Sequence, residues 1–118
     1  MFGLIVKFIA SPGKRDELIQ TLSAGFQNMA GCHSYILAED PADENGVWAT
    51  EIWESHESHQ QAMAQPDIKA VIAEAKAHNL TKGREMRVVT KPIGGQGLFR
   101  DTAWRPEPVL IHSGGANA

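Results

Sequence analysis

The alternation of hydrophobic and polar positions predicts four β-strands. The first, residues 2–10, is rich in Phe, Ile and Val and carries apolar side chains on both faces. One face presents Phe2, Leu4, Val6 and Phe8, and the other presents Gly3, Ile5, Lys7 and Ile9. Three more strands are predicted at 32–39, 47–54 and 84–91. The turn-forming residues 40–46 predict a hairpin loop between the second and third strands.

Helical spacing predicts a helix after the first strand and another after the third. Ser11 is the expected N-cap of the first helix, Pro12 its first residue and Gly31 its stop. Ser55 caps a short helix that breaks before Pro66, where a second helical piece begins. The apolar stripes are Leu18, Leu22, Phe26 and Met29 in the first helix, and Ile68, Val71, Ile72 and Ala75 in the last piece. The resulting order, βαββαβ, predicts a ferredoxin-like α+β fold.

Both faces of the first strand require cover, because helices on one side of a sheet leave the other side to water. We therefore expect at least a homodimer. Residues 1–92 form the predicted domain. Residues 93–118 are rich in Gly and Pro and predict an arm laid along a partner subunit, around Phe99, Trp104 and Ile111, with a loose end.

Composition narrows the class of protein. A chain of 118 residues with 42% hydrophobic residues predicts one globular domain. The net charge of −3 and the scattered Lys and Arg residues argue against nucleic acid as a partner. The longest apolar run, residues 4–6, is too short for a membrane span, and the N-terminus shows no secretory signal. Cys32 is the only cysteine, which predicts a cytoplasmic protein.

Several short motifs occur together in a characteristic order. They are the opening segments 3–6 and 12–16, the central segment 29–35, the strand-to-helix segments 51–59 and 63–66, and the late segment 94–97. Over roughly residues 1–98 the chain resembles the antibiotic biosynthesis monooxygenase family, in particular its quinol monooxygenase-like members.

This resemblance implies a dimeric α+β barrel with a pocket between the sheet and the helices of each subunit. Well-studied members of the family oxidise phenols or quinols with O2 and use no metal or flavin. The deprotonated substrate itself reduces oxygen. The protein then supplies an apolar pocket, a polar group that orients the phenol, and a base.

The resemblance also implies roles for two residues. Trp53 matches a strand tryptophan at the family's pocket. His59 falls where some members have Tyr, and its neutral imidazole would accept a phenolic proton. The chain departs from the family at Ala49, where some members bind substrate through Asn. It also lacks the Trp and His of the haem-degrading branch, which are replaced by Ala62 and Ile72.

Four further residues are predicted to bind substrate: Tyr35, His33, Phe26 and Trp48. His33 and Tyr35 share a predicted strand face, which lines either the pocket or the dimer interface. Trp48 packs either at that interface or beneath the first helix.

The candidate residues also have purely structural interpretations. Trp53 can be core filler, and His59 a solvated helix residue. His56 and His59 lie one helical turn apart and could bind a metal with Glu51 or Glu54, but two His residues without a clear third ligand favour no metal site.

Three functions follow from the sequence. The first is a cofactor-free monooxygenase of a phenol or quinol. The second is a dimeric ligand-binding or stress-associated protein of the same fold without turnover. The third is an isomerase or decarboxylase of a ring compound, with His59 as a proton shuttle.

Overall fold

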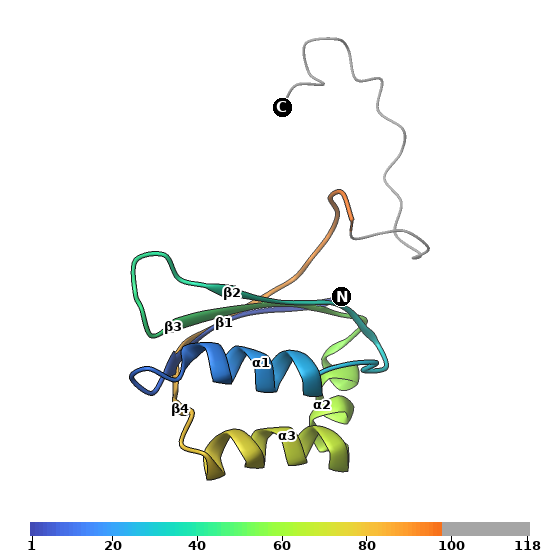
Figure 1. The fold of residues 1–118 in the computed structure, drawn as a ribbon. Coiled ribbons are helices and arrows are strands. Elements are labelled where there is room, and N and C mark those ends of the chain that lie inside the picture. Colours follow the sequence, from blue (N-terminus) through green and yellow to red (C-terminus); the bar gives the residue numbers. More distant parts are fainter. Residues whose placement is uncertain (98–118) are drawn as a thin grey trace, which may run out of the picture.

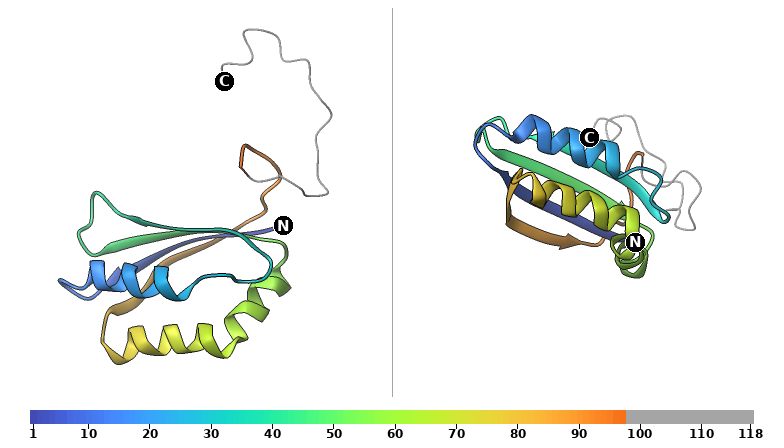
Figure 2. Two further views of the ribbon diagram at one scale, coloured as in Figure 1. Left: turned by 45° about the vertical axis from the view of Figure 1, so that its right-hand side comes forward. Right: turned by 60° about the horizontal axis from the view of Figure 1, so that its bottom comes forward.

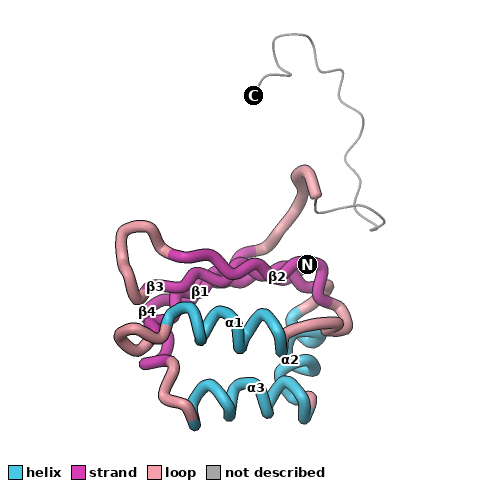
Figure 3. The backbone as a smooth tube through the Cα atoms, in the orientation of Figure 1, coloured by secondary structure: helices cyan, strands magenta, loops and turns pink. Residues whose placement is uncertain are grey.

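A computed structural model of the chain describes residues 1–97. Its elements are β1 (Phe2–Ala10), α1 (Arg15–Gly25), β2 (Cys32–Glu39), β3 (Gly46–Trp53), α2 (His56–Ala64), α3 (Pro66–Ala77) and β4 (Thr81–Thr90). The strands form one antiparallel sheet in the order β2-β3-β1-β4 (Figures 1 and 3). The predicted ferredoxin-like α+β fold, with its second helix in two parts, is confirmed.

The helices cover one face of the sheet (Figures 1 and 2). α1 and α3 lie side by side, and α2 lies at the end of the sheet where β3 finishes. Strand alternation sends one set of side chains into this layer. The core is lined by Phe2, Leu4, Val6, Ala49 and Trp53 at the α2 end, and by Ala10, Leu18, Leu22, Val47, Ala75 and Leu80 between the other helices and the sheet.

The limits of the first helix differ from the prediction. Ser11 does not cap it: α1 begins at Arg15, and the Ser11 carbonyl accepts a hydrogen bond from Lys14 N at 2.9 Å. The reason is Gly13, whose φ of +76° makes a turn before the helix that only glycine adopts freely. The helix ends at Gly25 and not near Gly31. A Cβ at Gly25 would lie 2.2 Å from Val71 Cγ2, so this glycine permits the close approach of α1 and α3.

The last strand begins at Thr81, three residues before the predicted start. Thr81 Oγ1 donates a hydrogen bond to the Ile9 carbonyl and accepts one from Gly83 N. Gly83 adopts a φ of +106° beside a register shift in this part of the strand. A glycine at such an irregularity interrupts the strand pattern, so the sequence predicted a later start.

A bulge in β4 decides which of its side chains face the helices. The register pairs Val6 with Arg87, Lys7 with Met86, and Phe8 with Arg84. Glu85 therefore has no partner on β1, and the alternation shifts by one residue. As a result Arg84 and Arg87, three positions apart, both lie opposite residues that face the helices. Glu85 Oε2 is 3.1 Å from Lys7 Nζ, which fixes the bulged residue.

The predicted hairpin between β2 and β3 is confirmed, and a polar network holds its loop. Lys7 Nζ lies 3.3 Å from Asp40 Oδ2 and 3.1 Å from Asp43 Oδ2. The Arg15 guanidinium donates to the backbone carbonyls of the same two aspartates. Lys7 is thus paired with three carboxylates, counting Glu85.

The opposite face of the sheet is not covered by any element of residues 1–97 (Figure 1). Ile36 is 58% exposed there, and Met86 and Val88 are 39% and 41% exposed. No helix in the described part of the chain has the length and hydrophobicity to cross a bilayer.

Candidate functional site

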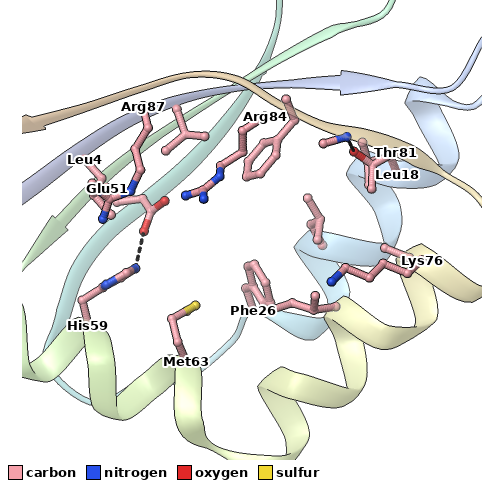
Figure 4. Close-up of a pocket in the computed structure, with 16 residues that line it drawn as sticks. Leu4, Leu18, Phe26, Glu51, His59, Met63, Lys76, Thr81, Arg84 and Arg87 are labelled. Atoms are coloured by element: carbon pink, nitrogen blue, oxygen red, sulfur yellow. Dashed lines mark hydrogen bonds and ion pairs between the residues drawn. The ribbon is translucent and has the colours of Figure 1, made fainter.

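A cavity of about 440 Å³ lies between the sheet and the helices (Figure 4). This volume is within the usual range for small-molecule sites. Its walls come from β1, α1, β3, α2, α3 and β4. The lining residues are Leu4, Val6, Phe8, Leu18, Leu22, Phe26, Glu51, His59, Met63, Ile72, Ala75, Lys76, Thr81, Gly83, Arg84 and Arg87. Most of this surface is apolar, and its polar groups are mainly ionisable.

Glu51 and His59 meet at one end of the cavity (Figure 4). Glu51 shares the helix-facing side of β3 with Ala49 and Trp53, so its carboxylate is buried. Trp53 Nε1 donates a hydrogen bond of 2.9 Å to Glu51 Oε1. His59 Nε2 lies 3.9 Å from the same oxygen, which is too long for a hydrogen bond.

Local structure fixes the position of His59. The predicted Ser55 cap of α2 is confirmed: Ser55 Oγ accepts a hydrogen bond of 3.0 Å from Ser58 N. This cap starts α2 directly after β3, and His59 then lies in its first turns. The imidazole packs edge-on against Trp53, with ring centroids 5.1 Å apart, and also contacts the Phe2 ring.

The environment shifts both pKa values in directions that suit proton transfer. Burial raises the pKa of Glu51, although the Trp53 hydrogen bond and the charge of Arg87 oppose this shift. Burial also lowers the pKa of His59, and the charges of Arg87 and His56 act in the same direction. His59 is therefore neutral near pH 7 and available as a base, beside an acid whose pKa is raised toward neutrality.

Three cationic side chains complete the lining. Arg84 and Arg87 project from β4 and Lys76 from α3 (Figure 4). Among the described residues that line the cavity, Glu51 is the only acidic one. Among residues 1–97, neither arginine nor Lys76 has a carboxylate within 4.0 Å.

The structure brings four of the sequence-predicted residues to this region. His59 and Phe26 line the cavity directly. Trp53 is fully buried and reaches the cavity only through its hydrogen bond to Glu51. Tyr35 lies behind Phe26, with the two rings edge to face at 5.3 Å, and burial raises its pKa well above the usual range.

Two other predicted residues lie elsewhere. His33 does not share a face with Tyr35, because a register shift between Cys32 and Ser34 breaks the alternation of β2. His33 is exposed and bonds Glu54 Oε2 at 2.6 Å.

Trp48 pairs with Lys7 and lies on the sheet face away from the helices, so it neither lines the cavity nor packs beneath α1. Its indole Nε1 donates a hydrogen bond of 3.0 Å to Asp40 Oδ2.

The metal site considered from the sequence, with His56 and His59 as ligands, has no counterpart in the described residues. His56 packs against the Phe2 ring at 4.8 Å. Within residues 1–97 no three His, Cys, Asp or Glu side chains gather at a spacing that would hold a metal ion.

From the sequence, Glu51 was considered only as a possible metal ligand, and Arg84 and Arg87 were assigned no role. Glu51 carried a usable signal, because it occupies a buried register between Ala49 and Trp53 on an otherwise apolar strand face. Arg84 and Arg87 carried none, since simple alternation places residues three apart on opposite faces of a strand.

Comparisons with known proteins agree with this architecture. The family model described as antibiotic biosynthesis monooxygenase matches residues 1–74. A crystal structure of a protein from Chloroflexus aurantiacus J-10-fl, assigned to the same family, is 40% identical, with a TM-score of 0.77 over 82% of this chain and 97% of that chain.

More distant structures share the fold. SnoaB, a cofactor-independent oxygenase from Streptomyces nogalater, is 15% identical, with a TM-score of 0.63 over 80% of this chain and 95% of that chain. PA3566 from Pseudomonas aeruginosa is 20% identical, with a TM-score of 0.66 over 79% of this chain and 94% of that chain. No curated protein matches the chain in sequence. From the match to the family model and the 40% identical relative, the chain belongs to the antibiotic biosynthesis monooxygenase family.

Proposed function

We propose that this protein is a monooxygenase that oxidises a phenolic or quinol-type aromatic compound with O2, without a metal or flavin. The observation that carries the proposal is the Glu51–His59 pair, which faces an apolar cavity large enough for an aromatic ring. Membership of the family supports the reaction type. SnoaB, which shares the fold, is a cofactor-independent oxygenase.

Proton removal from the substrate begins the reaction. Neutral His59 Nε2 accepts the phenolic proton, and Glu51 Oε1, 3.9 Å away, is the next group that can carry it. The apolar walls then hold the electron-rich anion away from water. The anion transfers one electron to O2, and the two radicals combine to form a carbon–oxygen bond.

The stoichiometry balances without a further reductant. Protonated His59 returns the phenolic proton to the peroxide, the ring carbon loses its hydrogen as a proton, the O–O bond breaks, and the released hydroxide takes up the ring proton. One quinol with a free ring carbon and one O2 thus give one hydroxyquinone and one water. The quinol supplies all of the electrons that reduce O2.

Oxygen uptake with isotopically labelled O2 tests this reaction. We expect the purified protein to consume O2 with a panel of two-ring and three-ring quinols, and to place one labelled oxygen atom in the product. His59→Gln, which keeps a polar side chain but does not titrate, should lose most of this uptake. Uptake no faster than the enzyme-free rate with every quinol would refute the proposal.

The same acid–base pair also suits a second reaction. Glu51 and His59 could relay a proton between two carbons of a ring compound without oxygen, as in an isomerase or a decarboxylase. Turnover of a ring substrate in anaerobic buffer would identify this alternative.

We further propose that the protein works as a homodimer that buries the open face of the sheet. The exposed Ile36, Met86 and Val88 support this arrangement. Val88→Lys should shift sedimentation toward the 12.9 kDa monomer. Deletion of 98–118, which lies outside the described residues and includes the expected arm around Phe99, Trp104 and Ile111, should weaken the dimer. A wild-type monomer at micromolar concentration would contradict this model.

A further inference from the structure

We infer that the cavity selects an aromatic compound that carries a carboxylate, and that Arg84 is the residue that binds this group. The placement of the compound's reacting hydroxyl at His59 rests on the proposed function. The recognition of the carboxylate stands on the charges of the cavity itself.

The first argument is the imbalance of charge. Arg84, Arg87 and Lys76 line the cavity, and within residues 1–97 its lining holds one carboxylate, Glu51. The charge of Arg87 opposes the rise in the pKa of Glu51, so Arg87 is the cation that favours this carboxylate. Arg84 and Lys76 are solvent-exposed and have no acidic partner within 4.0 Å among residues 1–97, so both can reach a bound ligand. Cationic groups that share a cavity with an apolar wall are complementary to an anionic ligand.

The second argument is that the fold places Arg84 at the cavity by a specific structural device. Without the bulge at Glu85, Arg84 and Arg87 would point to opposite faces of β4. The ion pair between Glu85 and Lys7, 3.1 Å long, holds the bulged residue on the other face of the sheet. Bulges commonly redirect a side chain toward a functional site.

The third argument is the arrangement of the groups along the cavity. In Figure 4 the Glu51–His59 pair lies at one end and Lys76 at the other, while Arg84 enters between them from β4. Phe8, Phe26 and Leu22 supply apolar surface for a ring. A planar compound with a hydroxyl at one end and a carboxylate toward the other fits this order, and a guanidinium binds a carboxylate through two parallel hydrogen bonds.

Binding of two matched probes tests the inference without any turnover. The probes are 6-hydroxy-2-naphthoate, with its hydroxyl and carboxylate at opposite ends of a two-ring system, and 2-naphthol, which lacks the carboxylate. Calorimetry should show wild-type protein binding the naphthoate about tenfold or more tightly, the size expected for a charge-assisted hydrogen bond. The preference should weaken as salt is added.

Variants of β4 identify the responsible residue. Arg84→Gln should remove most of the preference for the naphthoate and leave the affinity for 2-naphthol unchanged. Arg84→Lys should retain part of the preference. Lys82→Gln removes a positive charge from the same strand outside the cavity lining and should keep the full preference. Equal affinities for the two probes in the wild type, or an undiminished preference in Arg84→Gln, would overturn the inference.

The outcomes separate this inference from the proposed function. Charge-selective binding that depends on Arg84, without oxygen uptake by any quinol, would support the inference and refute the oxygenase. Oxygen uptake that is equally efficient with neutral quinols and with their carboxylated analogues would support the oxygenase and refute the inference.

Discussion

Two charged regions of this protein are built from similar residues and differ in how their charges are paired. At the β2–β3 loop, Lys7 contacts Asp40, Asp43 and Glu85 within 3.3 Å. In the described lining of the cavity, Arg84, Arg87 and Lys76 accompany one carboxylate, and these three cations form no ion pair among residues 1–97. Paired charges hold a loop and a bulge in place, whereas unpaired charges beside an apolar cavity are available to a ligand.

The hydrogen bonds of the two regions show the same difference. In the loop, Asp40 accepts from Ala42 N and Trp48 Nε1, and Asp43 accepts from Asn45 N. These bonds hold the pKa values of both aspartates below their usual range, and the carboxylates of Asp43 and Glu85 raise the pKa of Lys7. In the cavity, burial opposes the charged forms of Glu51 and His59. The loop thus stabilises its charges, while the cavity leaves its groups ready to exchange protons.

The largest expected effect is on catalysis in the cavity. His59→Ala should lower turnover by about 10²–10⁴-fold at neutral pH, the usual contribution of a general base. Because the pKa of His59 is lowered, wild-type activity should persist somewhat below pH 6.5 and fall at more acidic pH. Oxygen-electrode rates against pH measure this. Wild-type rates in His59→Ala across the pH range would show that the histidine is only structural.

The next largest effect is on stability, and it separates the packing role of Trp53 from its hydrogen bond to Glu51. Trp53→Ala should lower the free energy of unfolding by about 3–5 kcal/mol, as expected when a fully buried tryptophan is truncated. Trp53→Phe keeps most of the apolar volume but removes the indole donor to Glu51. It should lose much less stability while changing substrate affinity. Urea denaturation of both variants measures these losses. Equal losses in Trp53→Ala and Trp53→Phe would contradict this prediction and show that Trp53 stabilises the fold mainly through its hydrogen bond to Glu51.

A direct test of the comparison removes one cation from each region and compares the thermal midpoints of the two variants. Lys7→Met leaves three carboxylates without their cation and should lower the thermal midpoint more than the control Lys82→Met. It should also weaken the preference for 6-hydroxy-2-naphthoate, since the Glu85 bulge loses its ion pair. Arg84→Gln should leave the midpoint nearly unchanged. If Arg84→Gln destabilises the protein as much as Lys7→Met, the distinction between paired and unpaired charges fails.

The smallest effect is a difference in the pH dependence of stability. The lowered pKa of Asp40 gives stability that is present above its unfolded pKa, near 4, and is lost as pH falls through the folded value. The raised pKa of Glu51 acts in reverse: its contribution is present at low pH and is lost as pH rises through the folded value. Between pH 3 and 7, the stability of wild type relative to Asp40→Asn should therefore rise, and relative to Glu51→Gln it should fall. Parallel slopes in denaturation series would contradict these assignments.

The sequence by itself determined the order of the elements and one end of the site. Alternation on β1 and β3, the turn-rich 40–46 segment and the Ser55 cap are local features, and each had the predicted result. Trp53 and His59 are close in the chain, so the strand-to-helix junction was enough to bring their rings together.

Only the tertiary structure decided which distant side chains join that end. A single bulged residue reverses every following side chain of a strand, and pairing with a neighbouring strand determines where it occurs. In β2 this shift separates His33 from Tyr35, and in β4 it brings Arg84 and Arg87 to the same face. The loop network likewise places the Trp48 indole on Asp40, away from the cavity. The charge of the cavity therefore depends on strand pairing between residues about eighty positions apart, which local pattern does not encode.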